Sequence, residues 1–580
     1  MSVLISHSNV LAEESSGRTR AKHAVESLAL FLGVLLLFAL VTTIFFRQWM
    51  PYLNSALIGP PEDNMQDFWN TWYTAVARNP DHFFFTDLIR FPEGTPLYYH
   101  SFAYPKVIAI ALLSKVFGTN TTSLILLQNL SLLISFPLAG TGAFYLVRYL
   151  AANTAGALLG GFLFAFNPSH VEHVMHHAHV SSIEFIPFFV LTYLLTIERK
   201  SLLFLLLTII LYAINALSCW YYLFYIAYFI AFHTLYVANR DRALPRGWQL
   251  FAPVACLAGV IVALSPMLVP MVRAAIGSAA VYAGGGDIFV ADVFAYPAFP
   301  QFHLLAPLAD GIYQRLNGNE WEATVYLGFV NLAVLAGLCL AARDEDARLL
   351  TYVLCGMATF CIFASGDSLH VLGHRIIPMP DAALSNLPFF RNVRTPSRAI
   401  VFVYMFLAIG IGHAAALAWR HRQRPMVRWG MAAVAALIVL DFFPAHRLAM
   451  TPVACSSGLA VIRDDPEKGF GVLDLPSGRP AGYVEGNFYM LQQAACHSRP
   501  IAQGNTSRDV VVSVRDRLES RDLQAQQRQL AAAKVKYIVI NRNNMGLLFH
   551  WYPEDGPKDR YPLTYPTVYD GPDLTVLRVY

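Results

Sequence analysis

Eleven apolar segments occupy most of this chain, and they constrain its fold more than any other feature. A run of about 20 apolar residues is long enough to cross a bilayer as a helix. The segments are 27–46, 122–147, 152–167, 181–197, 202–217, 219–238, 251–272, 323–342, 349–366, 398–419 and 429–446. In a chain of 580 residues that is 56% hydrophobic, they predict an all-α polytopic membrane domain over 27–446, with about 11 transmembrane helices.

Basic residues in alternate connectors predict the orientation of these helices. The polar N-terminal tail, residues 1–26, carries Arg18, Arg20 and Lys22. Further basic connectors lie at 148, 199–200, 240–246, 343–348 and 420–428. Lys and Arg mark cytoplasmic loops, so the tail is predicted to be cytoplasmic. The remaining loops, 47–121, 168–180, 273–322, 367–397 and everything after 446, are then exterior.

That orientation requires the long first loop, 47–121, to begin and end outside the membrane. The apolar stretch 104–118 lies within it and carries Lys106 and Lys115. We therefore expect a helix that lies in the membrane interface and does not cross.

The sequence changes character near residue 452. Short β-type runs at 469–476, 534–541 and 574–580 alternate with the helical composition of 521–535. This pattern predicts a soluble, exterior α/β domain over 452–580. Cys455 and Cys496 both fall in it, and an exterior location permits a disulfide between them, although two cysteines do not establish one.

The first exterior loop is rich in acidic and aromatic residues. Glu62, Asp63 and Asp67 stand beside Trp69 and Trp72 in a chain that is only 14% charged. Carboxylates next to aromatic rings at a membrane surface suit proton abstraction and contact with a sugar or lipid. The alternative is a solvated loop with an interfacial aromatic belt.

A histidine cluster fills the next exterior loop, 168–180. If this loop is helical, Glu172 and His176, and likewise His173 and His177, are four residues apart on one face, which is a metal-ligand spacing. These four residues are the candidate ligands of a divalent metal ion. The HExxH pattern is absent, and the imidazoles could instead bind a phosphate or lie at the headgroup level.

Three arginines, Arg391, Arg394 and Arg398, stand at the exterior mouth of the span that begins at 398. Arginines are usually concentrated in cytoplasmic loops, so arginines on the exterior side need another explanation. A guanidinium can bind phosphate through two parallel hydrogen bonds. They are candidate ligands of a donor phosphate; the alternative is contact with anionic lipid headgroups. In loop 273–322, Asp287 follows three glycines, which predicts either a hinged lid over the site or an ordinary long loop.

Four short strings carry a resemblance to a known family. DFWNTWY, FPEGTPL, FNPSH and FRNVRTPSRA resemble bacterial polytopic members of the GT-C glycosyltransferase superfamily. That superfamily includes oligosaccharyltransferases, protein mannosyltransferases and the aminoarabinose transferase. The resemblance extends to about residue 446. It implies an enzyme whose catalytic base is an acid of the first exterior loop: Asp67, which precedes the two tryptophans, or else Asp63 or Glu62.

The resemblance also implies the substrates. The donor is a polyprenyl-phosphate sugar, whose leaving group is already a phosphate anion and needs no general acid. The acceptor is a glycan, lipid or protein, and the location is the exterior face of a bacterial inner membrane, with the C-terminal domain in the periplasm. The formal net charge of +4 forms no basic stripe, so nucleic acid is not a predicted partner. The alternative is a transporter, scaffold or lipid-binding protein that keeps a GT-C-like fold without catalysis.

Overall fold

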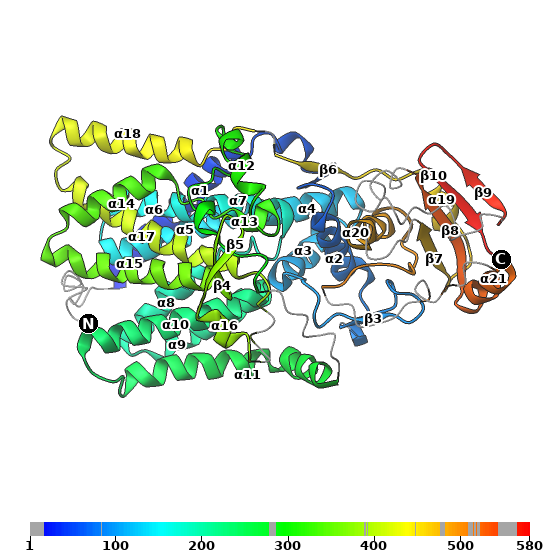
Figure 1. Ribbon diagram of the computed structural model, residues 1–580, viewed down its shortest axis with the longest axis horizontal. Coiled ribbons are helices and arrows are strands. Elements are labelled where there is room, and N and C mark those ends of the chain that lie inside the picture. The colour runs from blue at the N-terminus through cyan, green and yellow to red at the C-terminus, as the bar shows by residue number, and fades with distance from the viewer. Residues whose placement is uncertain are drawn as a thin grey trace.

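The structure is a computed structural model. It describes residues 17–580 except 83, 278–285, 388–389, 391–392, 447, 476–481, 508–513, 515–517, 519–521 and 543–564. Arg391 therefore lies outside the described residues. The molecule is elongated, with a bundle of long helices at one end and a small β-sheet at the other (Figure 1).

Every predicted apolar segment contains a helix. These helices are α1 (Gly17–Phe45), α4 (Thr121–Leu133), α5 (Ser135–Ala151), α6 (Thr154–Ala165), α8 (Ile186–Arg199), α9 (Leu202–Ser218), α10 (Trp220–Asp241), α11 (Trp248–Gly277), α14 (Phe329–Ala341), α15 (Asp344–Ala364), α17 (Ile400–Trp419) and α18 (Pro425–Asp441). Within the described residues, 6 helices or helix pairs are long and apolar enough to cross a membrane. The larger number of spans stays a prediction.

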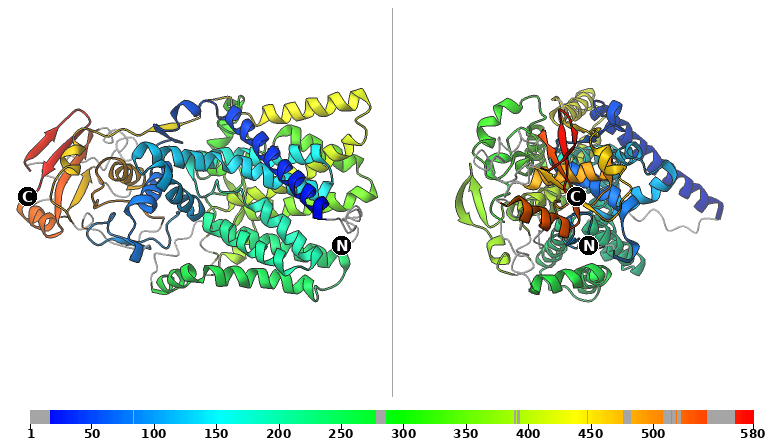
Figure 2. Two further views of the ribbon diagram at one scale, coloured as in Figure 1. Left: turned by 180° about the vertical axis from the view of Figure 1, so that it is seen from behind. Right: turned by 90° about the vertical axis from the view of Figure 1, so that its right-hand side faces the viewer.

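The turns that carry the predicted basic connectors gather at one end of the bundle. Figure 1 shows the turns α10–α11, α14–α15 and α17–α18 at the end opposite the C-terminal sheet, and the reverse view in Figure 2 agrees. This arrangement is what the alternation of basic connectors requires, because it gives the bundle one basic end.

Helix α17 forms the centre of the bundle. Its side chains are buried without interruption from Ile400 to His413, and it packs against α5, α6, α14 and α15. Small residues permit the closest of these contacts. A Cβ atom on Gly156 of α6 would lie 2.1 Å from the carbonyl oxygen of Gly412, and one on Gly160 would lie 2.8 Å from that of Ala408.

The first exterior loop folds over the end of the bundle that faces the sheet. It contains β1 (Ala56–Ile58), α2 (Asp63–Trp72), β2 (Phe85–Thr86), β3 (Thr95–Pro96) and α3 (Tyr104–Phe117). The helix predicted over 104–118 is thus confirmed as α3. It exposes Ile108, Leu112 and Val116, and an exposed apolar surface on a short helix suits the predicted place in the interface.

The other loops at this end hold short elements. They are α7 (Pro168–His176), α12 (Asp310–Tyr313), α13 (Glu320–Ala323), α16 (Asp381–Leu384) and the antiparallel hairpin of β4 (Ser368–Val371) and β5 (His374–Pro378). Figure 1 shows α7 and α13 next to each other, where the bundle meets the first loop.

The C-terminal region contains a mixed sheet with strand order β7-β8-β10-β9. Its strands are β7 (Gly471–Leu475), β8 (Val535–Asn541), β9 (Thr567–Asp570) and β10 (Leu574–Arg578), and its helices are α19 (Leu459–Arg463), α20 (Gly482–Gln492) and α21 (Leu523–Ala532). Strands β7 and β8 are parallel and the other pairs antiparallel. The three predicted β-runs and the predicted helix are confirmed as elements, and Cys455 and Cys496 form a disulfide.

The C-terminal region is tied to the first loop in two places. Strand β6 (Met450–Pro452), which follows α18, pairs antiparallel with β1, and α20 packs against α2. The indole nitrogen of Trp69 on α2 donates a hydrogen bond of 2.7 Å to Oε1 of Gln493. The first loop is therefore enclosed between the bundle and the C-terminal sheet.

The close approach of α6 and α17 predicts that Gly156→Ala destabilises the protein. The added methyl group meets a backbone oxygen that cannot move without shifting a helix, and overpacking of this kind costs about 1–3 kcal/mol. Thermal unfolding in detergent should show a lower midpoint. Gly337→Ala on α14 is the matched control, because its added Cβ atom would meet no described atom within 4 Å beyond the adjacent residues and backbone of its own helix. Equal midpoints for the two variants would contradict this account of the packing.

Candidate functional site

The site begins with the short helix α7, whose sequence fixes its start. The side chain of Asn167 accepts a hydrogen bond of 2.9 Å from the backbone N–H of His170, and Pro168 occupies the first helical position. Both are preferred at a helix N-terminus. The histidine-rich segment is thus helical, as the predicted spacing of the metal ligands requires. His173 and His177 lie on the same side of α7.

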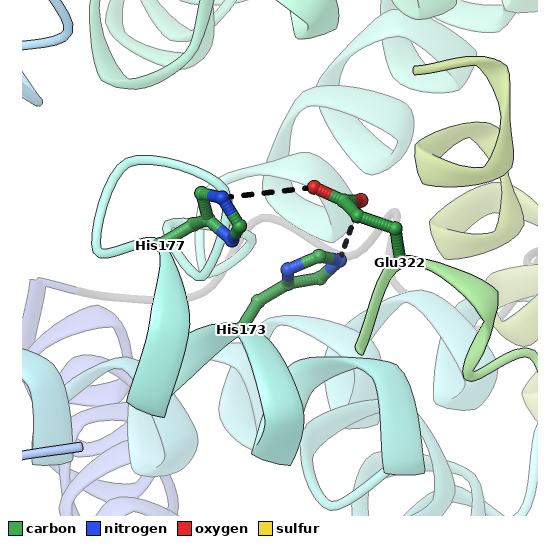
Figure 3. A group of neighbouring side chains, drawn as sticks. All are labelled: His173, His177 and Glu322. Carbon is green, nitrogen blue, oxygen red and sulfur yellow. Dashed lines mark ion pairs between the residues drawn. The ribbon is translucent and has the colours of Figure 1, made fainter. Parts of the chain in front are cut away.

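Glu322 of α13 faces these two histidines (Figure 3). The Nε2 atoms of His173 and His177 each lie 3.7 Å from a carboxylate oxygen of Glu322. The position of Glu322 is itself set by a helix cap, because the side chain of Asn319 accepts a hydrogen bond of 2.9 Å from its backbone N–H.

The first exterior loop brings Asp63 to the same place. Its Oδ2 atom lies 3.4 Å from Nε2 of His177, and its Oδ1 atom accepts a hydrogen bond of 3.3 Å from Asn487 of α20. Asn487 also donates to the backbone oxygen of Glu62 at 3.2 Å. A residue of the C-terminal region therefore orients the acid at the start of α2.

Asp67 lies one helical turn after Asp63 and accepts a hydrogen bond of 3.2 Å from the backbone N–H of Ala178. Burial and then the negative charge of Asp63 raise the pKa of Asp67 to about 8. The buried ammonium group of Lys106 on α3 donates to the backbone oxygen of Ala178 at 3.3 Å and to Ser181. It thereby supplies a positive charge close to Asp67.

The residues His173, His177 and Glu322 fit a divalent metal ion. One ligand atom from each lies within 4.8 Å of the others, and among the described residues this is the group whose geometry could hold a metal ion. Burial lowers the pKa of His173 to about 4 and that of His177 well below its usual range, so both imidazoles are neutral at pH 7. A neutral imidazole has the lone pair that a metal ligand needs.

The other two predicted ligands lie in a separate contact. His176 has its Nδ1 atom 3.1 Å from Glu62 and its Nε2 atom 3.7 Å from Glu172. Its ring stacks on Trp321 at a centroid distance of 4.3 Å. The four residues predicted as one ligand set are thus divided between two faces of α7.

Arg398 is the partner of Glu322. Its Nε atom donates to both carboxylate oxygens at 3.1 Å, a further bond runs from its Nη2 atom, and its guanidinium lies 4.7 Å from the ring centroid of Tyr221. Although burial alone would raise the pKa of Glu322, the charges of Arg398 and His173 hold it below its ordinary value. The guanidinium of Arg398, which was predicted to bind phosphate, therefore binds the carboxylate of Glu322 in this structure.

Arg394 lines a cavity of about 140 Å³ beside the site. The wall of the cavity includes His179, the last histidine of the loop 168–180, and Ser101 of the first loop. Much of the rest of the wall is apolar and comes from α9, α10 and α11, including Leu217, Phe224, Leu268 and Met271. The cavity thus joins a cation and an imidazole to an apolar slot between helices.

Three other predicted residues lie away from this group. Trp69 and Trp72 are buried in the apolar core between the first loop and the C-terminal region, and the sugar or lipid contact predicted for aromatic rings of this loop is therefore not available to them. Asp287 pairs with Arg375 at 2.5 Å and lies 3.6 Å from His370 of the β4–β5 hairpin. These contacts attach the end of the glycine-containing segment to the hairpin.

Sequence reasoning missed Glu322 and Asn487. An available signal for Glu322 was its place at the end of an exterior loop, in the string NEWEA, just before an apolar segment. Asn487 carries no such signal, because its role depends on the packing of α20 against α2.

Comparison with known proteins identifies the family and the fold. The family model described as a domain of unknown function, DUF6311, matches residues 69–443. No curated protein matches the sequence. Among solved structures, the apo oligosaccharyltransferase of Archaeoglobus fulgidus is 14% identical, with a TM-score of 0.52 over 89% of this chain and 70% of its own.

Two further structures are similar. The same archaeal enzyme tethered with an acceptor peptide containing the NVT sequon is 14% identical, with a TM-score of 0.50 over 92% of this chain and 71% of its own. ArnT from Cupriavidus metallidurans bound to undecaprenyl phosphate is 11% identical, with a TM-score of 0.46 over 96% of this chain and 98% of its own. The archaeal likenesses show that this chain has the GT-C fold, as the resemblance predicted. Its described residues also include 6 helices or helix pairs that are long and apolar enough to cross a membrane.

The buried pair of Arg398 and Glu322 predicts a large loss of stability in Arg398→Ala. Removing one partner leaves an uncompensated buried charge, which costs about 3–5 kcal/mol. Thermal or denaturant unfolding in detergent measures the loss, and adding Glu322→Gln should restore part of it. The control is Arg375→Ala, since that arginine is 67% exposed in its pair with Asp287 and an exposed pair contributes at most about 1 kcal/mol. Equal losses in the two single variants would refute the role of burial.

Proposed function

The chain belongs to the family of the domain of unknown function DUF6311, and we propose that it is a membrane glycosyltransferase that uses a polyprenyl-phosphate sugar. The observation that carries the proposal is the convergence of Asp63, His173, His177 and Glu322, from three separate loops, beside a cavity lined by a cation and apolar side chains. A lipid-linked anionic donor needs both kinds of lining.

In the proposed reaction, an acceptor hydroxyl oxygen attacks the anomeric carbon of the donor sugar. The bond from that carbon to the phosphate oxygen breaks, and its electron pair leaves with the polyprenyl phosphate. The hydroxyl proton passes to a carboxylate oxygen of Asp67. A base is most effective when its pKa lies near the working pH, and the pKa of Asp67, raised to about 8 by burial and by Asp63, meets that condition.

Asp63 and Glu322 have supporting roles in this proposal. His173, His177 and Glu322 would hold a divalent ion, which when bound supplies positive charge that stabilises phosphate oxygens. Asp63, held by Asn487, borders that group through His177. Arg398 keeps Glu322 ionised and directed toward the histidines.

Arg394 and the cavity are proposed to bind the donor. The guanidinium of Arg394 would bind the donor phosphate, as predicted for the arginines of this loop. The apolar wall from α9, α10 and α11 would receive the first part of the polyprenyl chain. Arg398, by contrast, is proposed to position Glu322, because its donors are directed to that carboxylate.

One assay tests the function directly. Purified protein is incubated with labelled polyprenyl-phosphate sugars and a mixture of candidate glycan, lipid and protein acceptors, and consumption of each donor is measured. Turnover of one donor supports a glycosyltransferase. Tight binding of a donor with no turnover under any acceptor would instead support a lipid-binding protein that keeps the GT-C fold.

The metal group predicts different results for neighbouring histidines. His173→Ala and His177→Ala should each lose most bound Zn²⁺ or Mn²⁺, because each removes a ligand from a three-residue group. His176→Ala is the matched control on the same helix, and it should keep about one ion per chain, as expected for a single site. Elemental analysis after dialysis measures the ion. Loss of metal from His176→Ala, with retention in His173→Ala, would assign the site to the other face of α7.

The proposed base predicts a pH-dependent turnover. Because Asp67 must be deprotonated to accept a proton, kcat/KM should rise with pH until it levels above about 8, the pKa raised by burial. Asp67→Asn keeps the shape and should lower turnover by about 10²-fold or more, with little remaining pH dependence over this range.

Asp63→Asn is the comparison for this experiment. If Asp63 is the base, it will show the larger loss and Asp67→Asn will retain the pH profile. Full turnover in both variants would remove the first-loop acids from the mechanism.

A further inference from the structure

A larger cavity, of about 560 Å³, lies between α6, α14, α17 and α18. Its inner wall is apolar and includes Leu159, Val334, Ile411 and Ala435. Arg422 of the α17–α18 turn lines one end of this groove, and that turn lies at the end of the bundle opposite the C-terminal sheet (Figure 1). The cavity therefore belongs to the basic end of the bundle and not to the candidate site.

Helix α18 has few contacts along this groove. All of its residues are described, and only Ile438 among them is buried. The helix is nonetheless apolar, and Met426 and Leu440 on it are 81% and 66% exposed. An apolar helix that stands away from its neighbours in a membrane needs other apolar groups to fill the space between them.

The open end of the groove is cationic. Arg422 and Arg428 both line it, and the adjoining turn adds Arg420 and Arg424. The guanidinium of Arg422 lies 5.2 Å from the ring centroid of Trp419, and that of Arg428 lies 5.6 Å from that of Trp429. The described lining residues include no acid. Tryptophan beside arginine is typical of the headgroup level of a membrane.

We propose that this groove binds an anionic phospholipid. Its phosphate would lie between Arg422 and Arg428, and one acyl chain would run along the apolar wall between α17 and α18. A transmembrane helix, about 10 Å across and about 30 Å long, has a volume several times the 560 Å³ of the groove, whereas a single acyl chain is small enough to be held there. The charge agrees with the leaflet, because the basic end is the predicted cytoplasmic side and anionic lipids are concentrated there.

The test measures lipid affinity of the purified, delipidated full chain by native mass spectrometry in detergent. Phosphatidylglycerol, which is anionic, should bind the wild type more tightly than phosphatidylcholine, which has no net charge. The double variant Arg422→Ala, Arg428→Ala should bind phosphatidylglycerol about tenfold more weakly or worse, the scale expected for losing charge-assisted hydrogen bonds. Arg242→Ala with Arg246→Ala, on the exposed α10–α11 connector, is the matched control and should bind like the wild type.

A second variant tests the chain-binding half of the groove. Ala435→Phe keeps both arginines and fills the apolar wall, so it should also weaken phosphatidylglycerol binding. Equal affinity of the wild type for the two lipids would overturn the proposal, as would wild-type affinity in both the arginine and the Ala435 variants. Inorganic phosphate should not displace the lipid. Displacement by phosphate would assign the arginines to a free anion and would also overturn the proposal.

Discussion

The buried ion pair between Arg398 and Glu322 is the interaction on which the candidate site depends. Arg398 lies just before the central helix of the bundle, α17, and Glu322 belongs to a loop that would otherwise bring a carboxylate into an apolar environment at great cost. The pair places Glu322 where both histidines of α7 can approach it. The same contact connects the rigid centre of the bundle to the chemistry at its end.

A second constraint comes from the C-terminal region. The first loop carries the acids, but its position is set by β6 pairing with β1, by the hydrogen bond that Asn487 donates to Asp63 and by the one that Gln493 accepts from Trp69. Buried amide side chains of this kind must be satisfied, so they specify one register of α2 against α20. The C-terminal region thus contributes to the geometry of the site, although it supplies none of the proposed reacting groups.

The two ends of the bundle have different chemistry. At one end, loops from distant parts of the sequence bring carboxylates and imidazoles together in a buried site. At the other, short connectors carry arginines and border an apolar groove between α17 and α18. The separation follows from membrane physics, since long polar loops and short basic connectors are sorted to opposite sides. It allows a lipid to be bound at one end without contact with the site at the other.

Local pattern alone was enough to predict the helices at the apolar segments, α3 in the first loop, and the strands and helix of the C-terminal region. It also identified the chemical types in the site, because Asp63, His173 and His177 are conspicuous in an apolar chain. Periodicity and composition are local properties, so one sequence suffices to read them.

The tertiary structure decided how those groups are combined. His173 and His177 face Glu322, while His176 contacts both Glu62 and Glu172. The pairs Glu172/His176 and His173/His177 have the same spacing, so only the packing around α7 distinguishes them. Trp69 was expected at the site and instead packs against the C-terminal region. Arg398 was predicted to bind phosphate and holds Glu322. Each of these outcomes depends on how the loops are placed relative to one another. Contacts between residues far apart in the chain determine that placement.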